Sequence, residues 1–235
     1  VTGWDNIDMM ADDDPLYVGR GGIMGDRPGN FAVQNADLVL AVGNRLSIRQ
    51  FGYSFKTWAR AAKVVMVDVD GEELKKPTLH VDLPIQADAA DFLRVLDSLL
   101  PEGAFYPENG WQDTCRHWKK DYPVTLPRHY AAKGLTNVYA FIDSLSARLP
   151  EGYVTVVGNG SACVVGSHGY HIKKGQRFII NSAIASMGYD LPAAIGVCRA
   201  VGREIVCITG DGSIQMNLQE LQTILTNRLP IKIFV

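Results

Sequence analysis

The sequence predicts an α/β protein made of two partial doubly wound domains, each with a mainly parallel sheet, joined by a Pro-rich linker. Three observations support this fold class. Short, continuous apolar runs bounded by turn residues are typical of strands buried on both faces, as in parallel sheets. Amphipathic segments alternate with these runs, which is the pattern of βαβ units. Residues 101–128 contain several prolines and interrupt the alternation, which indicates a domain boundary.

The first domain is expected to cover residues 1–100 and to be Rossmann-like. Residues 36–43 and 63–70 are short apolar runs, which predicts two buried strands. The segment 53–62 between them carries apolar side chains at helical spacing, which predicts a crossover helix. A strand, a helix and a strand in this order imply a right-handed βαβ unit. Residues 87–100 predict a closing helix with one apolar side.

The second domain is expected to cover residues 129–235, after the linker at 101–128, which is partly helical around 111–120. Apolar runs and amphipathic segments alternate again, which predicts a second sheet covered by helices. The expected strands are 153–157, 178–180, 205–209 and 231–235, and the expected helices are 136–148, 191–200 and 218–226. Domains of this kind bind ligands where strands turn into helices.

The charge balance and the cysteines limit the classes of protein to which this chain can belong. Lys and Arg total 23 against 25 Asp and Glu, a formal net charge of −2. Nucleic acids and anionic membranes require a basic surface, so neither is expected as a partner. No apolar run approaches the roughly 20 residues of a membrane-spanning helix. The first residues show neither the basic region nor the apolar stretch that is typical of a signal peptide, and the four cysteines form no CxxC pair. These features predict a cytoplasmic enzyme with free thiols.

Both ends have the character of positions inside a longer polypeptide. The chain starts at Val1 rather than at a methionine, and residues 231–235 form an apolar strand with nothing after it. A strand that ends a chain leaves its ladder without a continuation, which natural proteins rarely do. We therefore expect an internal piece of a larger protein, truncated at both ends.

The strongest local signal is the turn Gly210-Asp211-Gly212-Ser213, which follows the apolar run 205–209. Glycines permit backbone conformations that a Cβ forbids, and exposed N–H groups beside a helix start favour a phosphate. A carboxylate beside a phosphate needs a bridging cation, and Mg²⁺ fits a site of carboxylate and phosphate oxygens. A short Gly motif is weak by itself, and the alternative is an ordinary Asx turn that caps a helix.

The neighbourhood of this turn carries a resemblance. The turn resembles the opening of the thiamine diphosphate motif, which closes with an Asn pair after the next strand, and residues 231–235 occupy the place of that strand. Upstream, the run from Ser186 to Gly196 is similar to the segment that meets the middle of the cofactor in the same family. With both features in this order, the chain is identified as a member of the acetolactate synthase-like group of thiamine diphosphate-dependent enzymes.

The resemblance implies a set of cofactor residues in the second domain. Asp211 would bind Mg²⁺, while Gly212 and Ser213 would meet the diphosphate. Met187 would be the bulky apolar wedge between the two rings of the cofactor; without the family it is a flexible core filler. The loop after the strand 153–157 would add polar contacts. The full cofactor set is Asn159, Gly160, Ser161, Met187, Gly210, Asp211, Gly212 and Ser213.

The first domain carries a second, weaker resemblance. Residues 43–52 align without gaps on the segment that contacts FAD in acetolactate synthases, and Arg49 occupies the position of an arginine that contacts the flavin cofactor. Asp68 and Asp70 lie at the end of the predicted strand 63–70, where a Rossmann-like domain meets a nucleotide ribose. The acidic pair before that arginine is replaced here by Ser47-Ile48. FAD, an adenine nucleotide without flavin, and surface charges on a ligand-free domain all stay open.

The resemblance also implies an activity. The expected enzyme is a transferase or lyase that makes or breaks a C–C bond next to a carbonyl, by 2-oxo acid decarboxylation with carboligation. It would form a homodimer or tetramer with a shared active site. No catalytic residue is expected in this stretch, since the activating Glu of the family lies in a pyrimidine-binding domain of the partner subunit. The fragment alone is therefore expected to be inactive.

Two alternatives to this activity remain. Acetolactate synthases typically carry a Gly-x-His-Gln pattern where this chain has Gly158-Asn159-Gly160-Ser161. That departure leaves room for a simple 2-oxo acid decarboxylase or a 2-hydroxyacyl-CoA lyase-like enzyme. An alternative of another class is a non-catalytic nucleotide-binding module. The intact turn 210–213 argues against the module, because such a module has no need of a carboxylate at a phosphate corner.

Overall fold

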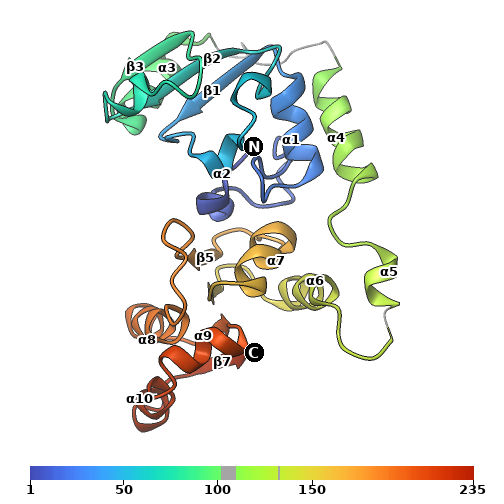
Figure 1. Ribbon diagram of the computed structural model, residues 1–235, viewed down its shortest axis with the longest axis vertical. Helices are drawn as coiled ribbons and strands as arrows, with labels where there is room; N and C mark the ends of the chain where they lie inside the picture. Colours follow the sequence, from blue (N-terminus) through green and yellow to red (C-terminus); the bar gives the residue numbers. More distant parts are fainter. Residues whose placement is uncertain (102–109, 132) are drawn as a thin grey trace. The chain divides into compact units, whose positions relative to one another are not determined.

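A computed structural model describes residues 1–101, 110–131 and 133–235 (Figure 1). Within these ranges the chain divides into two compact units. The first unit holds Val1 and residues 18–122, and the second holds residues 2–17 and 123–235. Each unit contains a parallel sheet with helices between its strands, so the predicted α/β class is confirmed. In the described ranges, no helix has the length and apolar character needed to cross a membrane.

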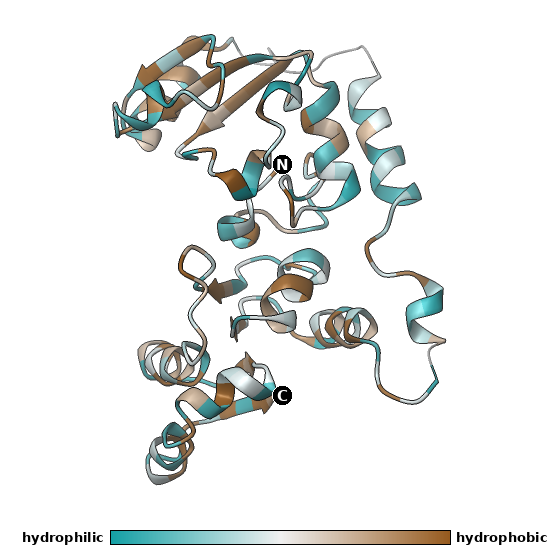
Figure 2. Ribbon diagram, in the orientation of Figure 1, coloured by the Kyte–Doolittle hydropathy of each residue, from teal (hydrophilic) through white to brown (hydrophobic). Residues whose placement is uncertain are grey.

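The first unit is built on a three-stranded parallel sheet in the order β1-β2-β3. Apolar residues dominate β1 and β2 (Figure 2), and Ala41 and Met66 lie in a core that also holds Leu46 and Leu79. Helix α1 packs against α4, which is hydrophilic over much of its length. The elements are α1 (Arg27–Asn35), β1 (Leu38–Val42), β2 (Lys63–Asp68), β3 (Leu83–Gln86), α3 (Ala89–Leu99) and α4 (Trp111–Asp121).

The crossover helix expected at 53–62 does not form. The connection holds a short α2 (Ile48–Phe51), which ends at Gly52, and a 3-10 turn (Phe55–Thr57). Ala59 has a φ of 47°, which is outside the helical region. Trp58 still packs against the core of the first unit. A ten-residue segment gains little from helix formation alone, so its helical periodicity was not sufficient to form a helix.

Part of the stretch expected as a linker, residues 101–128, packs with the first unit. Residues 102–109 lie outside the described residues, but α4 (Trp111–Asp121) belongs to the first unit. Its Trp118 meets the ring of Phe31 on α1 at a centroid distance of 5.7 Å, and Tyr122 meets the same ring at 5.2 Å. Burial of aromatic surface therefore attaches this stretch to the first unit.

The second unit is built on a four-stranded parallel sheet in the order β5-β4-β6-β7. The chain leaves β4 toward β5 on one side and leaves β6 toward β7 on the other. The direction of winding therefore reverses between β4 and β6, and open α/β sheets bind ligands at such a switch point. The strands are β4 (Val154–Val157), β5 (Arg177–Ile180), β6 (Ile205–Ile208) and β7 (Ile231–Phe234).

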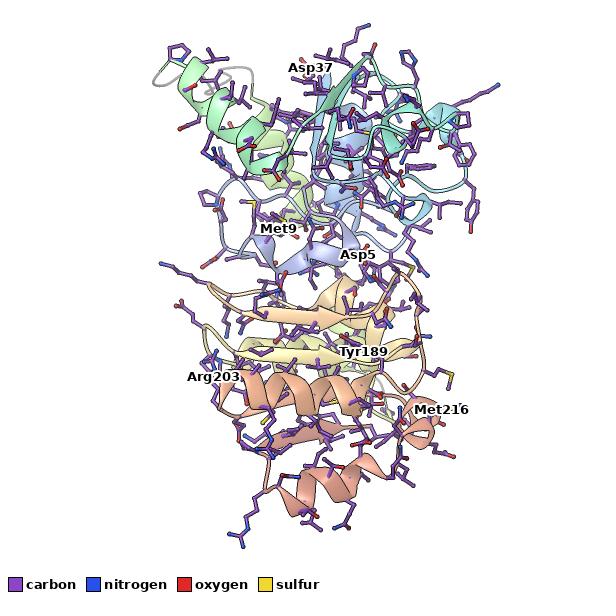
Figure 3. The ribbon with its side chains drawn as sticks, turned by 90° about the vertical axis from the view of Figure 1, so that its left-hand side faces the viewer. Asp5, Met9, Asp37, Tyr189, Arg203 and Met216 are labelled. Atoms are coloured by element: carbon purple, nitrogen blue, oxygen red, sulfur yellow. The ribbon has the colours of Figure 1, made fainter. Side chains whose placement is uncertain are left out.

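Helices cover both faces of this sheet. One apolar core joins Val157 and Ile208 to helices α6 and α7, and a second joins Val156 and Cys207 to α8, α9 and α10. Tyr189 and Arg203 mark the two ends of α8 in Figure 3. Burial of each such aliphatic side chain contributes about 1.5–3 kcal/mol. The helices are α5 (Pro127–Tyr130), α6 (Val138–Arg148), α7 (Ser161–Gly169), α8 (Asp190–Val201), α9 (Asp211–Met216) and α10 (Glu220–Thr226).

Residues 2–17, which the sequence analysis places in the first domain, make their contacts with the second unit. Ile7, in the 3-10 helix Trp4–Met9, is buried in the core of α6 and α7. The Oδ2 atom of Asp8 accepts from Arg177 Nε at 2.8 Å and from the backbone N–H of Phe178 at 3.0 Å. The segment therefore covers the outer edge of β5, where a backbone donor would otherwise lack a partner.

A histidine holds the same segment in a way that depends on pH. The ring of His171 lies 2.6 Å from Asp143 Oδ1 and 3.5 Å from Asp12 Oδ2. The hydrogen bond to Asp12, and then the one to Asp143, raise the pKa of His171. A raised folded-state pKa means that the stabilisation is complete below the unfolded value of about 6.5 and is lost as the pH rises through the folded value.

Amide exchange in residues 5–12, corrected for its intrinsic rate, is therefore expected to be faster at pH 8.5 than at about pH 5.5. The effect is modest, because the His171 side chain is 49% exposed. His171→Gln should remove most of this pH dependence, while His117→Gln on α4 should preserve it. An unchanged pH dependence in His171→Gln would show that another group holds the segment.

Candidate functional site

A cleft of about 560 Å³ opens at the carboxyl ends of β4 and β6, the switch point of the second sheet. The loop after β4 and the turn after β6 form its floor. Val138 and Phe141 of α6, with Phe234 of β7, form an apolar wall, and the rings of Phe141 and Phe234 lie 5.4 Å apart. A cleft with an apolar wall and a few polar groups at its floor is typical of a small-molecule site.

The predicted cofactor residues come together at this cleft. All of them line it, although they come from three separate stretches of the chain: Asn159, Gly160, Ser161, Met187, Gly210, Asp211, Gly212 and Ser213. The carboxyl ends of parallel strands meet at one edge of a sheet, which explains why distant residues converge here.

Main-chain atoms are accessible to a ligand at the floor of the cleft. Gly160 precedes α7 with a φ of 85°, and a Cβ there would meet nothing within 4 Å, so a ligand can approach the main chain. At Gly210 the nearest atom to an added Cβ is Asn159 O at 3.9 Å. The first N–H groups of α7 and α9 have no partner inside their helices, so both turns offer donors to an anion.

Asp211 is the first residue of α9 and its side chain is exposed. Among the described residues that line the cleft, Asp211 is the only one with an ionisable acid, and none is Lys or Arg. A polyanion in this cleft would therefore meet backbone donors and a carboxylate, with no side-chain cation to balance its charge. A divalent cation on Asp211 would resolve this repulsion, because carboxylate oxygens are ligands that Mg²⁺ prefers.

Met187 is not a core filler. Its side chain is 48% exposed, and its Cε lies 3.0 Å from the position that a Cβ on Gly212 would take. The side chain of Ser213 is buried, and its Oγ accepts from the Gly188 N–H at 2.9 Å. The hydroxyl of Ser213 therefore holds the turn that carries Met187.

The sequence analysis missed the polar support beneath the cleft. Asp190 is fully buried; its Oδ2 accepts from the Thr209 hydroxyl, and its Oδ1 accepts from the Leu191 N–H at 3.0 Å. Burial, and then the charge of Asp190, raise the pKa of Cys207 to about 12, so this thiol stays neutral. An Asp directly before the apolar run Leu191-Pro192-Ala193-Ala194 was the available signal. A charged residue is almost never buried without partners.

The residues proposed for a nucleotide lie in the first unit. Arg49 is on α2, and its carbonyl accepts from the Ile23 N–H at 2.9 Å. Asp68 is the last residue of β2, and its Oδ1 accepts from the Asp70 N–H at 2.9 Å. The carboxylate of Asp68 thus has a local role in the turn after β2.

Two families match most of the chain. Residues 158–235 match the family described as "Thiamine pyrophosphate enzyme, C-terminal TPP binding domain", and residues 1–96 match "Thiamine pyrophosphate enzyme, central domain". The chain belongs to the thiamine pyrophosphate enzyme family. The first match begins at the end of β4 and includes every cofactor residue predicted above. Thiamine pyrophosphate is another name for thiamine diphosphate, so the resemblance found in the sequence is confirmed.

Curated relatives point to one branch of this family. The chain is 30% identical over 97% of its length to the acetolactate synthase isozyme 1 large subunit of Escherichia coli. It is 34% identical over 94% to the acetolactate synthase large subunit of Cyanidium caldarium, and 33% identical over 94% to isozyme 2 of Escherichia coli. The chain spans 40%, 37% and 38% of the lengths of these relatives. It is therefore similar to less than half of each of these subunits.

Proposed function

We propose that this thiamine pyrophosphate family chain belongs to an acetolactate synthase-like enzyme that uses thiamine diphosphate and Mg²⁺ and acts on a small 2-oxo acid. The observation that carries the proposal is the cleft at the switch point. There, the described lining residues bring together backbone donors and one carboxylate, Asp211, and include no side-chain cation. That combination suits a diphosphate bound through a divalent cation.

The residues of the cleft fit the parts of this cofactor. The turns at 158–161 and 210–213 would meet the diphosphate through their N–H groups, and Asp211 would bind Mg²⁺. Met187 and the apolar wall would contact the rings and exclude water from them. When bound, thiamine diphosphate supplies the chemistry at the substrate carbonyl and accepts the electrons of the broken C–C bond.

The remaining features of the enzyme are proposals that follow from the family. Asp211 and Met187 bind and orient the cofactor, and the activating Glu would come from a pyrimidine-binding domain of a partner subunit. The protein would then be a cytoplasmic homodimer or tetramer, and residues 1–235 alone would be inactive. A nucleotide at Arg49 and Asp68, with FAD as one candidate, remains a prediction, as do the domain bounds 1–100 and 129–235.

Titration calorimetry of thiamine diphosphate into the protein at its full native length tests the proposal. Binding is expected with Mg²⁺ and should be lost when EDTA removes the metal. A folded protein that binds no thiamine diphosphate in Mg²⁺ would contradict the enzyme assignment and favour the non-catalytic module.

Product analysis with pyruvate, the simplest 2-oxo acid, then separates the alternatives. Carboligation of two pyruvates supports the acetolactate synthase-like reaction. Release of free aldehyde from pyruvate supports the simple decarboxylase. In a separate assay with a 2-hydroxyacyl-CoA as the substrate, cleavage supports the lyase.

A further inference from the structure

We propose that Ser213 and Asn217 are positioning residues that hold the peptide units on either side of Gly188 and thereby keep Met187 in the cofactor cleft. The inference rests on the proposed function and deepens it, because it assigns the binding of the cofactor rings to a hydrogen-bonded clasp. Neither side chain needs to touch the cofactor for this role.

The clasp consists of two hydrogen bonds to one residue. The Gly188 N–H donates to Ser213 Oγ at 2.9 Å, and Asn217 Nδ2 donates to the Gly188 carbonyl at 2.6 Å. The Asn217 Oδ1 accepts from Gln219 Nε2 at 3.0 Å, which is consistent with its amide nitrogen facing Gly188. Ser213 is a residue of α9, and Asn217 directly follows the last residue of that helix. The helix that begins at Asp211 therefore also holds the turn of Met187.

The turn at Gly188 lies in close contact with the end of α9. Gly188 has a φ of 81°, and a Cβ there would lie 2.7 Å from Met216 Cβ and 2.9 Å from Asn217 Nδ2. Tyr189, which follows Gly188, and Met216 lie at the same end of the second unit (Figure 3). With no room for a side chain at Gly188, small displacements of this turn would be resisted by α9 itself.

Packing alone does not explain the position of Met187. Its side chain is 48% exposed and lines the cleft, with its Cε close to Gly212. A flexible, half-exposed methionine has several accessible rotamers, so the direction of its backbone determines whether it enters the cleft. Loss of the clasp should therefore weaken contacts to the rings of the cofactor and leave the diphosphate anchor at Asp211 intact.

The test compares two ligands on the protein at its full native length, both titrated with Mg²⁺: thiamine diphosphate, which has rings, and inorganic diphosphate, which has none. Asn217→Asp keeps the shape of the side chain and removes the donor, and Asn217→Ala removes the side chain. Each variant should reduce the affinity for thiamine diphosphate about tenfold and the affinity for inorganic diphosphate less than about twofold. Gln222→Ala, an exposed amide on α10, is the matched control and should change neither affinity.

A double-variant comparison makes the proposal specific to Met187. Met187→Ala should reproduce the selective loss, and adding Asn217→Ala to it should cost little more, because both changes remove one interaction. Three outcomes would overturn the clasp while the proposed function stands. They are an equal loss of affinity for both ligands, full additivity of the two changes, and unchanged affinities in folded Asn217 variants. A native protein that binds neither ligand would overturn the proposed function itself.

Discussion

Asp211→Ala should reduce the Mg²⁺-dependent affinity for thiamine diphosphate by roughly 100-fold or more. The carboxylate of Asp211 is the only acidic group among the described residues that line the cleft. Without it, the diphosphate would have backbone donors but no cation to offset its charge. Titration calorimetry with and without Mg²⁺ measures the loss.

Two further variants make the result interpretable. Asp211→Asn keeps an oxygen ligand and should bind more weakly than the native protein but better than Asp211→Ala. Asp97→Ala removes one exposed negative charge from the first unit and should leave the affinity unchanged. Native affinity in a folded Asp211→Ala protein would mean that the turn is an ordinary helix cap and that the metal lies elsewhere.

Gly158→Ala should destabilise the second unit by roughly 3 kcal/mol. A Cβ at Gly158 would lie 2.4 Å from Asp190 Oδ2. Asp190 is fully buried and bound to the Thr209 hydroxyl, so it has no solvent-exposed position to move into. Displacing it would leave a buried carboxylate short of a donor at the base of the cleft. Urea or thermal unfolding of the second unit measures the change.

A matched glycine separates this clash from the general effect of alanine. Gly196 lies in α8 of the same unit, and a Cβ there would meet nothing within 4 Å. Gly196→Ala should therefore stabilise the unit by about 0.5–1 kcal/mol. In a double-mutant cycle, Gly158→Ala should lower the free energy of unfolding much less in the Asp190→Ala protein than in the native protein. Simple additivity of the two changes would place the strain of Gly158→Ala away from Asp190.

The sequence was sufficient for features whose signal is local. Apolar runs such as 205–209 became buried parallel strands, because a strand covered on both faces needs apolar residues throughout. The turn at 210–213 was visible because its glycines and carboxylate are adjacent in the chain. The family resemblance placed this turn together with residues 159–161, and the structure brings both to one edge of the parallel sheet.

Only the tertiary structure decided which contacts are made between distant residues. Residues 2–17 join the second unit because Ile7 fits its core and Asp8 satisfies a donor on the edge of β5. The segment 53–62 forms a 3-10 turn in place of an α-helix, and its Trp58 packs against the core of the first unit. Ser213 and Asn217 hold Gly188 only because the folded sheet brings α9 to the turn of Met187. Periodicity and motif spacing report local preference, whereas partner choice depends on burial and hydrogen bonding across the fold.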